Sequence, residues 1–154
     1  MLKPGDQAPV LEVPDADMHP INTASYRGKK NLVVYFYPKD DTPGCTIEAQ
    51  DFSDLLPEFE AHDTLVFGVS RDNCVSHAEF RDKYGLAVTL VADVDGQVCK
   101  AYGVWQERQR NGEKRMALVR STFVIDKDGI VRHALYDVKP KGHAEEVLEL
   151  VKQL

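Results

Sequence analysis

The stretch LVVYFYPKDDTPGCT, residues 32–46, decides the fold, because within it a strand passes into a helix. Its first six residues are apolar, β-branched or aromatic, which is typical of a buried strand. Pro38 ends this strand, since proline cannot donate a hydrogen bond to a sheet. Thr42 is a favoured N-cap residue, and Pro43 suits the first position of a helix. The pattern therefore predicts a short loop and places Cys45 in the first turn of the helix that follows it.

A cysteine in the first turn of a helix lies beside unpaired backbone N–H groups and the positive end of the helix dipole. Both favour the thiolate form of Cys45, which is the nucleophilic form. With Thr42 as the N-cap residue, Cys45 is the third residue of the helix. The Thr42 hydroxyl is therefore expected to accept a hydrogen bond from the backbone N–H of Cys45. Gly44 has no side chain and leaves room for a small substrate. The same position also suits a small buried core residue, so position alone makes Cys45 only a candidate.

Length, charge and cysteine content limit the class of protein. The chain has 154 residues, which fits one domain covering residues 1–154. It carries 19 basic and 25 acidic side chains, giving a net charge of −6 that argues against nucleic acid as a main partner. We find no apolar signal segment and no run long enough to span a membrane, so we expect no membrane contact. Three cysteines without framework spacing favour a reducing cytoplasm.

Strand and helix patterns alternate along the rest of the chain. Beyond the Cys45 helix we expect strand 64–70, a helix from about 73 to 84, strand 88–92, helix 97–102, a hairpin of 121–125 with 130–135, and a last helix after 142. Pro57 is expected to kink or restart the Cys45 helix. The basic residues within 108–115 are interpreted as part of a solvated loop.

This alternation predicts an α/β fold with a mainly parallel central sheet, flanked by helices and completed by antiparallel edge strands. The order suits a thioredoxin-like domain. A flavodoxin-like sheet fits the same alternation, but no Gly-rich phosphate loop follows the first strand.

The string PKDDTPGCT, residues 38–46, resembles the active-site loop of the peroxiredoxins, whose pattern is Pro, three residues, Thr or Ser, two residues, Cys. The continuation TIEAQDF resembles the bacterioferritin-comigratory-protein group, also called PrxQ. Similar strings extend the match over nearly the whole chain: PGDQAP, GVSRD, KYGL, KAYGVW and RSTFVIDKDG. The resemblance implies a thioredoxin-like fold with a central mixed sheet and an N-terminal hairpin. It also implies thiol-dependent reduction of hydrogen peroxide and organic hydroperoxides without a metal, haem or flavin cofactor.

The implied reaction is attack of the Cys45 thiolate on a peroxide oxygen, which converts the thiol to a sulfenic acid. The backbone amides of Gly44 and Cys45, with the Thr42 hydroxyl, are expected to align the peroxide and stabilise the departing oxygen. Pro38 is expected to shield the site from water. A fixed cation is also needed, and the residues alone do not choose among the arginines. The match to RSTFVID implies that Arg120 supplies it.

The thiol that completes the reaction cycle is left open. Many members of the group carry a resolving cysteine five residues after the first one, or on the following helix; these positions correspond here to Gln50 and a residue near Arg81. Cys74 and Cys99 match neither position and are expected to face the core. Cys74 is kept as a possible resolving residue. The favoured interpretation is a one-Cys cycle, in which thioredoxin, glutaredoxin or glutathione reduces the sulfenic acid of Cys45.

Other functions are weighed against this one. A redox-sensing module of the same fold would form the same sulfenic acid without sustained turnover. The chain has no Cys-x-x-Cys pair for a disulfide reductase, and its five histidines lack metal-ligand spacing. A Cys-His-Asp hydrolase needs a histidine beside Cys45, and nothing in the sequence places one there. The expected partners are therefore a hydroperoxide and a reducing thiol, and the expected state is a monomer.

Overall fold

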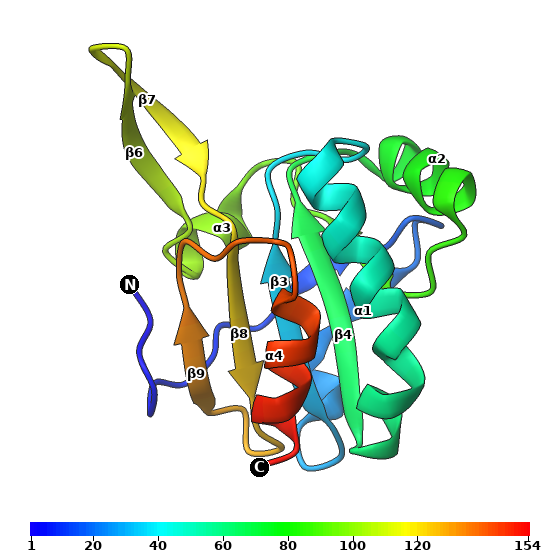
Figure 1. The fold of residues 1–154 in the computed structure, drawn as a ribbon. Helices are drawn as coiled ribbons and strands as arrows, with labels where there is room; N and C mark the ends of the chain where they lie inside the picture. The colour runs from blue at the N-terminus through cyan, green and yellow to red at the C-terminus, as the bar shows by residue number, and fades with distance from the viewer.

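The computed structural model describes all 154 residues around a five-stranded mixed sheet (Figure 1). The strand order is β5-β4-β3-β8-β9. Three neighbouring strands run parallel: β3 (Asn31–Phe36), β4 (Thr64–Ser70) and β5 (Thr89–Ala92). The other two are antiparallel to their neighbours: β8 (Ser121–Ile125) and β9 (Val131–Leu135). The predicted α/β class, with a parallel half and an antiparallel edge, is confirmed.

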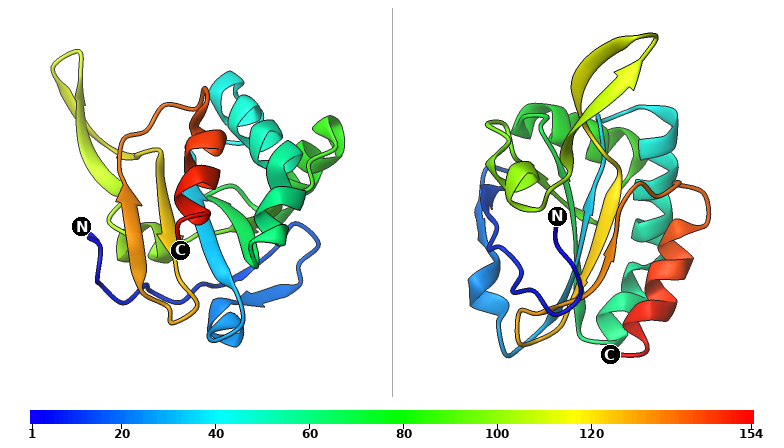
Figure 2. Two further views of the ribbon diagram at one scale, coloured as in Figure 1. Left: turned by 60° about the horizontal axis from the view of Figure 1, so that its bottom comes forward. Right: turned by 90° about the vertical axis from the view of Figure 1, so that its left-hand side faces the viewer.

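Helices cover both faces of this sheet. They are α1 (Pro43–Ala61), α2 (Cys74–Tyr84), the short α3 (Gln97–Ala101) and α4 (His143–Val151). α1 and α4 lie side by side on one face, while the N-terminal segment and α3 cover the other (Figure 2). Each face has its own apolar cluster because successive side chains of a strand point in opposite directions. Val33 and Tyr35 enter the first cluster, and Val34 and Phe36 enter the second.

An N-terminal hairpin precedes the sheet, as expected. Its strands β1 (Glu12–Pro14) and β2 (Pro20–Asn22) pair antiparallel and lead into a 3-10 helix, η1 (Thr23–Tyr26). A bridge between Asp15 and Val91 connects the hairpin region to the edge strand β5. Every helix is too short or too polar to span a lipid bilayer.

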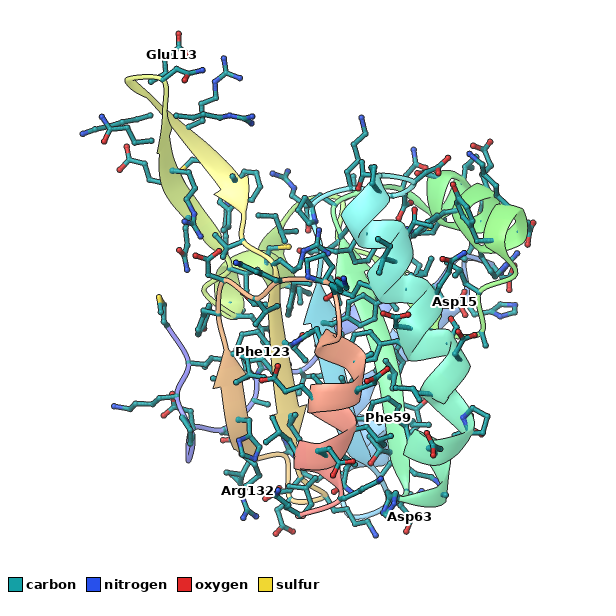
Figure 3. The ribbon with its side chains drawn as sticks, viewed as in Figure 1. Asp15, Phe59, Asp63, Glu113, Phe123 and Arg132 are labelled. Carbon is teal, nitrogen blue, oxygen red and sulfur yellow. The ribbon has the colours of Figure 1, made fainter.

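A second hairpin, β6 (Trp105–Arg110) with β7 (Glu113–Leu118), projects from the body, with Glu113 labelled near its tip in Figure 3. The basic residues within 108–115 were interpreted as part of a solvated loop. They are exposed, as expected, but their backbone forms two paired strands and not a loop. Asn111 and Gly112 form the turn with φ values of 52° and 78°. An Asn-Gly turn favours such a hairpin. Because the outer part of the hairpin buries no face, it shows no apolar alternation.

The helix that begins after Thr42 continues through Pro57, so the expected restart at that proline is wrong. Proline removes one helical hydrogen bond. Phe52 and Phe59, one on each side of Pro57, are both fully buried in the cluster under α1. Their packing holds the two halves in one helix, because most helical stability in proteins comes from tertiary contacts.

Candidate active site

The candidate site lies where β3 ends and α1 begins, at the carboxyl edge of the parallel strands (Figure 1). This edge is where loops of α/β sheets commonly form binding sites. The register of the sheet pairs Phe36 at the end of β3 with Ser121 at the start of β8. Arg120 therefore emerges beside the loop that leads to Cys45, although the two residues are 75 positions apart.

Arg120 binds the sulfur of Cys45 and a carboxylate at the same time. Its Nη2 donates to Cys45 Sγ at 3.3 Å, and its Nη1 donates to Glu48 Oε1 at 2.7 Å. Cys45 is only 1% exposed and lies in the apolar cluster under α1. A negative charge on a sulfur so deeply buried is costly unless a cation compensates it. The guanidinium is placed to provide that compensation.

Gly44 allows this close approach. A Cβ atom at position 44 would lie 3.2 Å from Arg120 Nη2 and 3.3 Å from Cγ of Pro140. The space beside Gly44, expected to admit substrate, is thus occupied by the guanidinium and a proline ring. A side chain here would push Arg120 away from the sulfur.

The first turn of α1 leaves two backbone donors free. No protein acceptor pairs with the N–H groups of Gly44 or Cys45, and the first helical bond runs from Thr46 N to Thr42 O at 2.8 Å. The expected hydrogen bond from the Cys45 N–H to the Thr42 hydroxyl is wrong. That hydroxyl instead donates to the carbonyl of Lys39 at 2.9 Å. The Thr42 oxygen can still accept a hydrogen bond, and the two amides remain free to donate one each.

The residue before Thr42 has an uncommon backbone conformation. Asp41 has a φ of 57°, in the left-handed region that non-glycine residues seldom adopt. Asp41 stands between Lys39 and Thr42, so this backbone conformation lies inside the turn that the Thr42–Lys39 hydrogen bond closes.

Pro38 is exposed and lines a cavity of about 380 Å³ beside the loop. The other lining residues are Arg71, Val94, Trp105, Ala117 and Leu118. The guanidinium of Arg71 lies 4.6 Å from the centre of the Trp105 ring, a cation–π contact. Pro38 therefore borders an apolar cavity, and its expected role in shielding the sulfur from water remains a prediction.

Glu48 is a site residue that sequence reasoning missed. It lies one helical turn after Cys45, is 0% exposed, and leaves its Oε2 without a hydrogen-bond partner. Burial raises the pKa of its carboxyl to about 7, against the opposing effect of the Arg120 charge. The spacing of three residues along one helix, which places side chains on the same face, was the available signal.

Tyr35 on β3 adds a second buried polar group to this region. Its hydroxyl has no hydrogen-bond partner, and burial raises its pKa well above the usual value, with the charge of Glu48 adding to the effect. A Cβ atom at Gly68 would lie 2.6 Å from this hydroxyl, so β4 needs a glycine there. Buried groups without partners are uncommon in proteins and cluster here around Cys45.

Replacing Glu48 with glutamine is expected to flatten the pH dependence of stability. The folded protein holds the Glu48 proton more tightly than the unfolded chain does, because the pKa rises from 4.5 to about 7 on folding. The stabilisation is complete below pH 4.5 and is lost as the pH rises through 7. The loss is roughly 3 kcal/mol for a shift of this size. Urea unfolding of both proteins between pH 4.5 and 8 measures it, and parallel curves would contradict the assignment.

Neither of the other two thiols belongs to the apolar cluster that contains Cys45. Cys74 is the first residue of α2. It was expected to face the core, but it is only half-buried. Cys99 is fully buried, as expected, in the cluster on the opposite face of the sheet from Cys45. Burial raises the pKa of the Cys99 thiol, and Asp93 adds to the effect, which disfavours its reactive thiolate form. All three cysteines are unpaired.

Comparison with known proteins agrees with the fold and the site. Residues 4–134 match the AhpC/TSA family. The putative peroxiredoxin bcp of Helicobacter pylori strain J99 is 43% identical, over 96% of this chain and 97% of its own length. Peroxiredoxin Bcp of Escherichia coli K12 is 38% identical, over 99% and 97% of the two chains.

Solved structures give the same result. One is the bacterioferritin comigratory protein of Xanthomonas campestris, whose structure was reported for its alkyl peroxide reduction activity. It has a TM-score of 0.89 at 40% identity, and the match covers 93% of this chain and 90% of that one. A Cys-to-Ser variant of Xylella fastidiosa PrxQ has a TM-score of 0.90 at 36% identity, covering 99% and 97%.

The thioredoxin-like α/β fold and these matches define an enzyme of the thiol-dependent peroxidase class. The chain belongs to the AhpC/TSA family and, within it, to the peroxiredoxins of the Bcp or PrxQ group. The resemblance seen in the loop sequence is thereby confirmed.

Proposed function

We propose that this peroxidase reduces hydrogen peroxide and organic hydroperoxides at Cys45. The observation that carries the proposal is the single guanidinium that contacts the sulfur at 3.3 Å, beside two unpaired amides in the same helical turn. Together these groups offer positive charge both to the thiolate and to an oxygen that becomes negative as the O–O bond breaks.

The proposed step begins with the Cys45 thiolate in line with the O–O bond. The sulfur attacks the terminal oxygen, an S–O bond forms, and the O–O bond breaks. The departing oxygen takes both bonding electrons and then one proton from water, which replaces the proton that Cys45 lost on ionisation, so that the products are a Cys45 sulfenic acid and water or an alcohol. The Thr42 oxygen, whose own proton is held by Lys39 O, accepts the hydrogen bond of the incoming peroxide. Arg120 and the amides of Gly44 and Cys45 stabilise the departing oxygen.

Organic hydroperoxides are included because of the cavity beside the loop. Pro38 and Trp105 give it apolar walls close to the segment that carries Cys45. An alkyl group would be removed from water there, which favours binding in proportion to the apolar area covered. The alkyl peroxide reduction activity named for the Xanthomonas campestris relative supports the same substrate class.

We propose a one-Cys cycle that is completed by thioredoxin, glutaredoxin or glutathione. Cys99 lies in the cluster across the sheet from Cys45, so the two sulfurs cannot meet without disruption of the core. Cys74 begins a different helix, and an atypical two-Cys cycle with Cys74 as the resolving residue is the alternative. We also propose that the protein is a cytoplasmic monomer, since three cysteines without framework spacing fit a reducing compartment.

One equivalent of hydrogen peroxide separates these possibilities. The expected result is loss of one of the three thiols and a mass increase of one oxygen atom, since a sulfenic acid forms on Cys45 alone. Thiol counting and intact-mass measurement on the quenched protein check it. Loss of two thiols would show an internal disulfide and contradict the one-Cys cycle; a Cys74→Ser variant would then identify the partner. No loss of thiol at all would contradict the peroxidase mechanism.

A redox-sensing role uses the same oxidised state and is separated from the enzyme by turnover. Excess peroxide and excess dithiothreitol should give steady peroxide consumption far beyond one equivalent of protein. Consumption that stops after one equivalent, with reductant still present, would favour the sensor.

A further inference from the structure

Two consecutive residues of the loop before Cys45 are bonded to α2. The carboxylate of Asp41 accepts from Lys83 Nζ at 2.7 Å and from the Tyr84 hydroxyl at 2.6 Å, both near the end of α2. The carboxylate of Asp40 contacts His77 and accepts from the Ser76 hydroxyl at 2.8 Å, both near the start of α2. The loop is therefore attached along the length of the helix.

The Asp40–His77 contact is the buried part of this attachment. Asp40 is 7% exposed and His77 is 0% exposed, and Asp40 Oδ2 lies 2.7 Å from His77 Nδ1. The other ring nitrogen, Nε2, lies 2.9 Å from the carbonyl oxygen of Val91. Both ring nitrogens are therefore engaged, Nε2 with the backbone of β5 and Nδ1 with the carboxyl group of Asp40.

The surrounding groups complete the hydrogen bonding of this pair. The Tyr37 hydroxyl donates to Asp40 Oδ1 at 2.6 Å, and the backbone N–H of Asp40 donates to Asp72 Oδ2 at 2.8 Å. The Ser70 hydroxyl donates to the same Asp72 oxygen at 2.7 Å. Asp40, Asp72 and His77 also have the spacing of a metal site, but their polar atoms are already bonded to protein groups. A fully satisfied buried network of this kind fixes one conformation of the loop.

The Asp40–His77 pair lies where it can affect both steps of the proposed cycle, the oxidation of Cys45 and the reduction of its sulfenic acid. Oxidation of Cys45, as proposed above, needs the folded first turn of α1, where the two unpaired amides and the Thr42 oxygen are held close to one another. Hydrogen peroxide is a small molecule, whereas glutathione or a protein thiol must bring a much bulkier group to a residue that is only 1% exposed, so for reduction that turn must open. A contact made only in the closed form shifts the balance toward the closed form.

We propose that Asp40 and His77 are a positioning pair, which holds the Cys45 loop closed for oxidation and must be released before an external thiol can reach the sulfenic acid. This inference rests on the proposed peroxidase function and adds to it the group that sets the balance between the two steps. Neither residue is proposed to touch the substrate.

Two variants test it, Asp40→Asn and Tyr37→Phe. Asn keeps the shape of Asp40 and removes its charge, and Phe removes only the hydroxyl that donates to Asp40. The matched control is Tyr102→Phe, which removes the hydroxyl of another buried tyrosine, bonded to Pro9 O at 2.6 Å in the cluster on the other face of the sheet. Single-turnover oxidation by hydrogen peroxide and reduction of the preformed sulfenic acid by glutathione are measured separately by rapid quench and mass spectrometry.

The expected result is a split between the two steps. Oxidation slows by about tenfold in Asp40→Asn and by about threefold in Tyr37→Phe, because each variant removes a contact that stabilises the closed form of the loop. Reduction by glutathione accelerates by a similar factor in each, because the turn opens more often. The Tyr102→Phe control should stay close to the wild-type rates in both steps.

Three outcomes would overturn the positioning role: unchanged rates in both variants, slowing of both steps together as general destabilisation produces, or equal effects in the control. If Asp40→Asn does not fold, the milder Tyr37→Phe decides the question alone. Failure of the peroxidase proposal itself looks different, because wild-type Cys45 would then not react with peroxide at all.

Discussion

Peroxide consumption is expected to stop when Cys45 is replaced with serine. A serine hydroxyl does not ionise near neutral pH, so the Arg120 guanidinium and the free amides would face a neutral, weakly nucleophilic oxygen. The rate constant should fall by more than about 10³-fold, since losing a nucleophile removes the covalent step itself. A coupled assay with excess hydrogen peroxide and dithiothreitol measures the loss.

The controls for this variant are Cys74→Ser and Cys99→Ser. Both should keep most of the wild-type activity, because Cys74 begins a different helix and Cys99 lies across the sheet. Activity that survives in Cys45→Ser, or is lost in the Cys99 variant while that protein remains folded, would move the reaction to another thiol.

Removing the cation should have the second largest effect. Arg120→Ala is expected to lower the second-order rate constant for oxidation by about 10²- to 10³-fold, the usual cost of losing a preorganised charge in a buried site. It also leaves Glu48 buried without its ion pair. Arg120→Lys should retain part of the rate, since an ammonium carries the charge but lacks the two-pronged geometry that reaches Sγ and Oε1 together. Stopped-flow oxidation with hydrogen peroxide measures both.

Arg132→Ala is the matched control, because it makes the same change in charge at an exposed residue of β9 that pairs only with Asp126. Its oxidation rate should equal that of the wild type. If Arg120→Ala, correctly folded, also oxidises at the wild-type rate, Arg120 has no part in the reaction.

Much of the fold could be predicted from local sequence because its signals agree with its packing. Asn73 caps α2 through its side chain, and Gly85 ends that helix at a φ of 61°, both as the residue types indicate. The apolar run in β3 marked the centre of the sheet, where both faces are buried. The β6–β7 hairpin escaped prediction since its outer side chains meet solvent on both faces, and only Asn111-Gly112 marked its turn.

The site was predicted only in part, for a physical reason. The position of Cys45 in the helix could be read from the residues next to it, whereas Arg120 came from resemblance because the sheet register brings it near. Glu48 and the Asp40–His77 pair were missed, since buried charged residues are rare and the partners that make them tolerable lie far apart in the chain. The predicted Thr42–Cys45 hydrogen bond was wrong because the Thr42 hydroxyl has a competing acceptor in the loop, the carbonyl of Lys39, which the residue types did not reveal.

Trp105 has a practical consequence. It is the only tryptophan of the chain, it is half-buried beneath Arg71, and it shares a cavity wall with Pro38, the first residue of the loop. The tryptophan fluorescence of the protein therefore comes from one ring beside the Cys45 loop, and indole emission depends on nearby charge and water. The opening of the loop that we propose above can therefore be tested optically in the unlabelled wild-type protein.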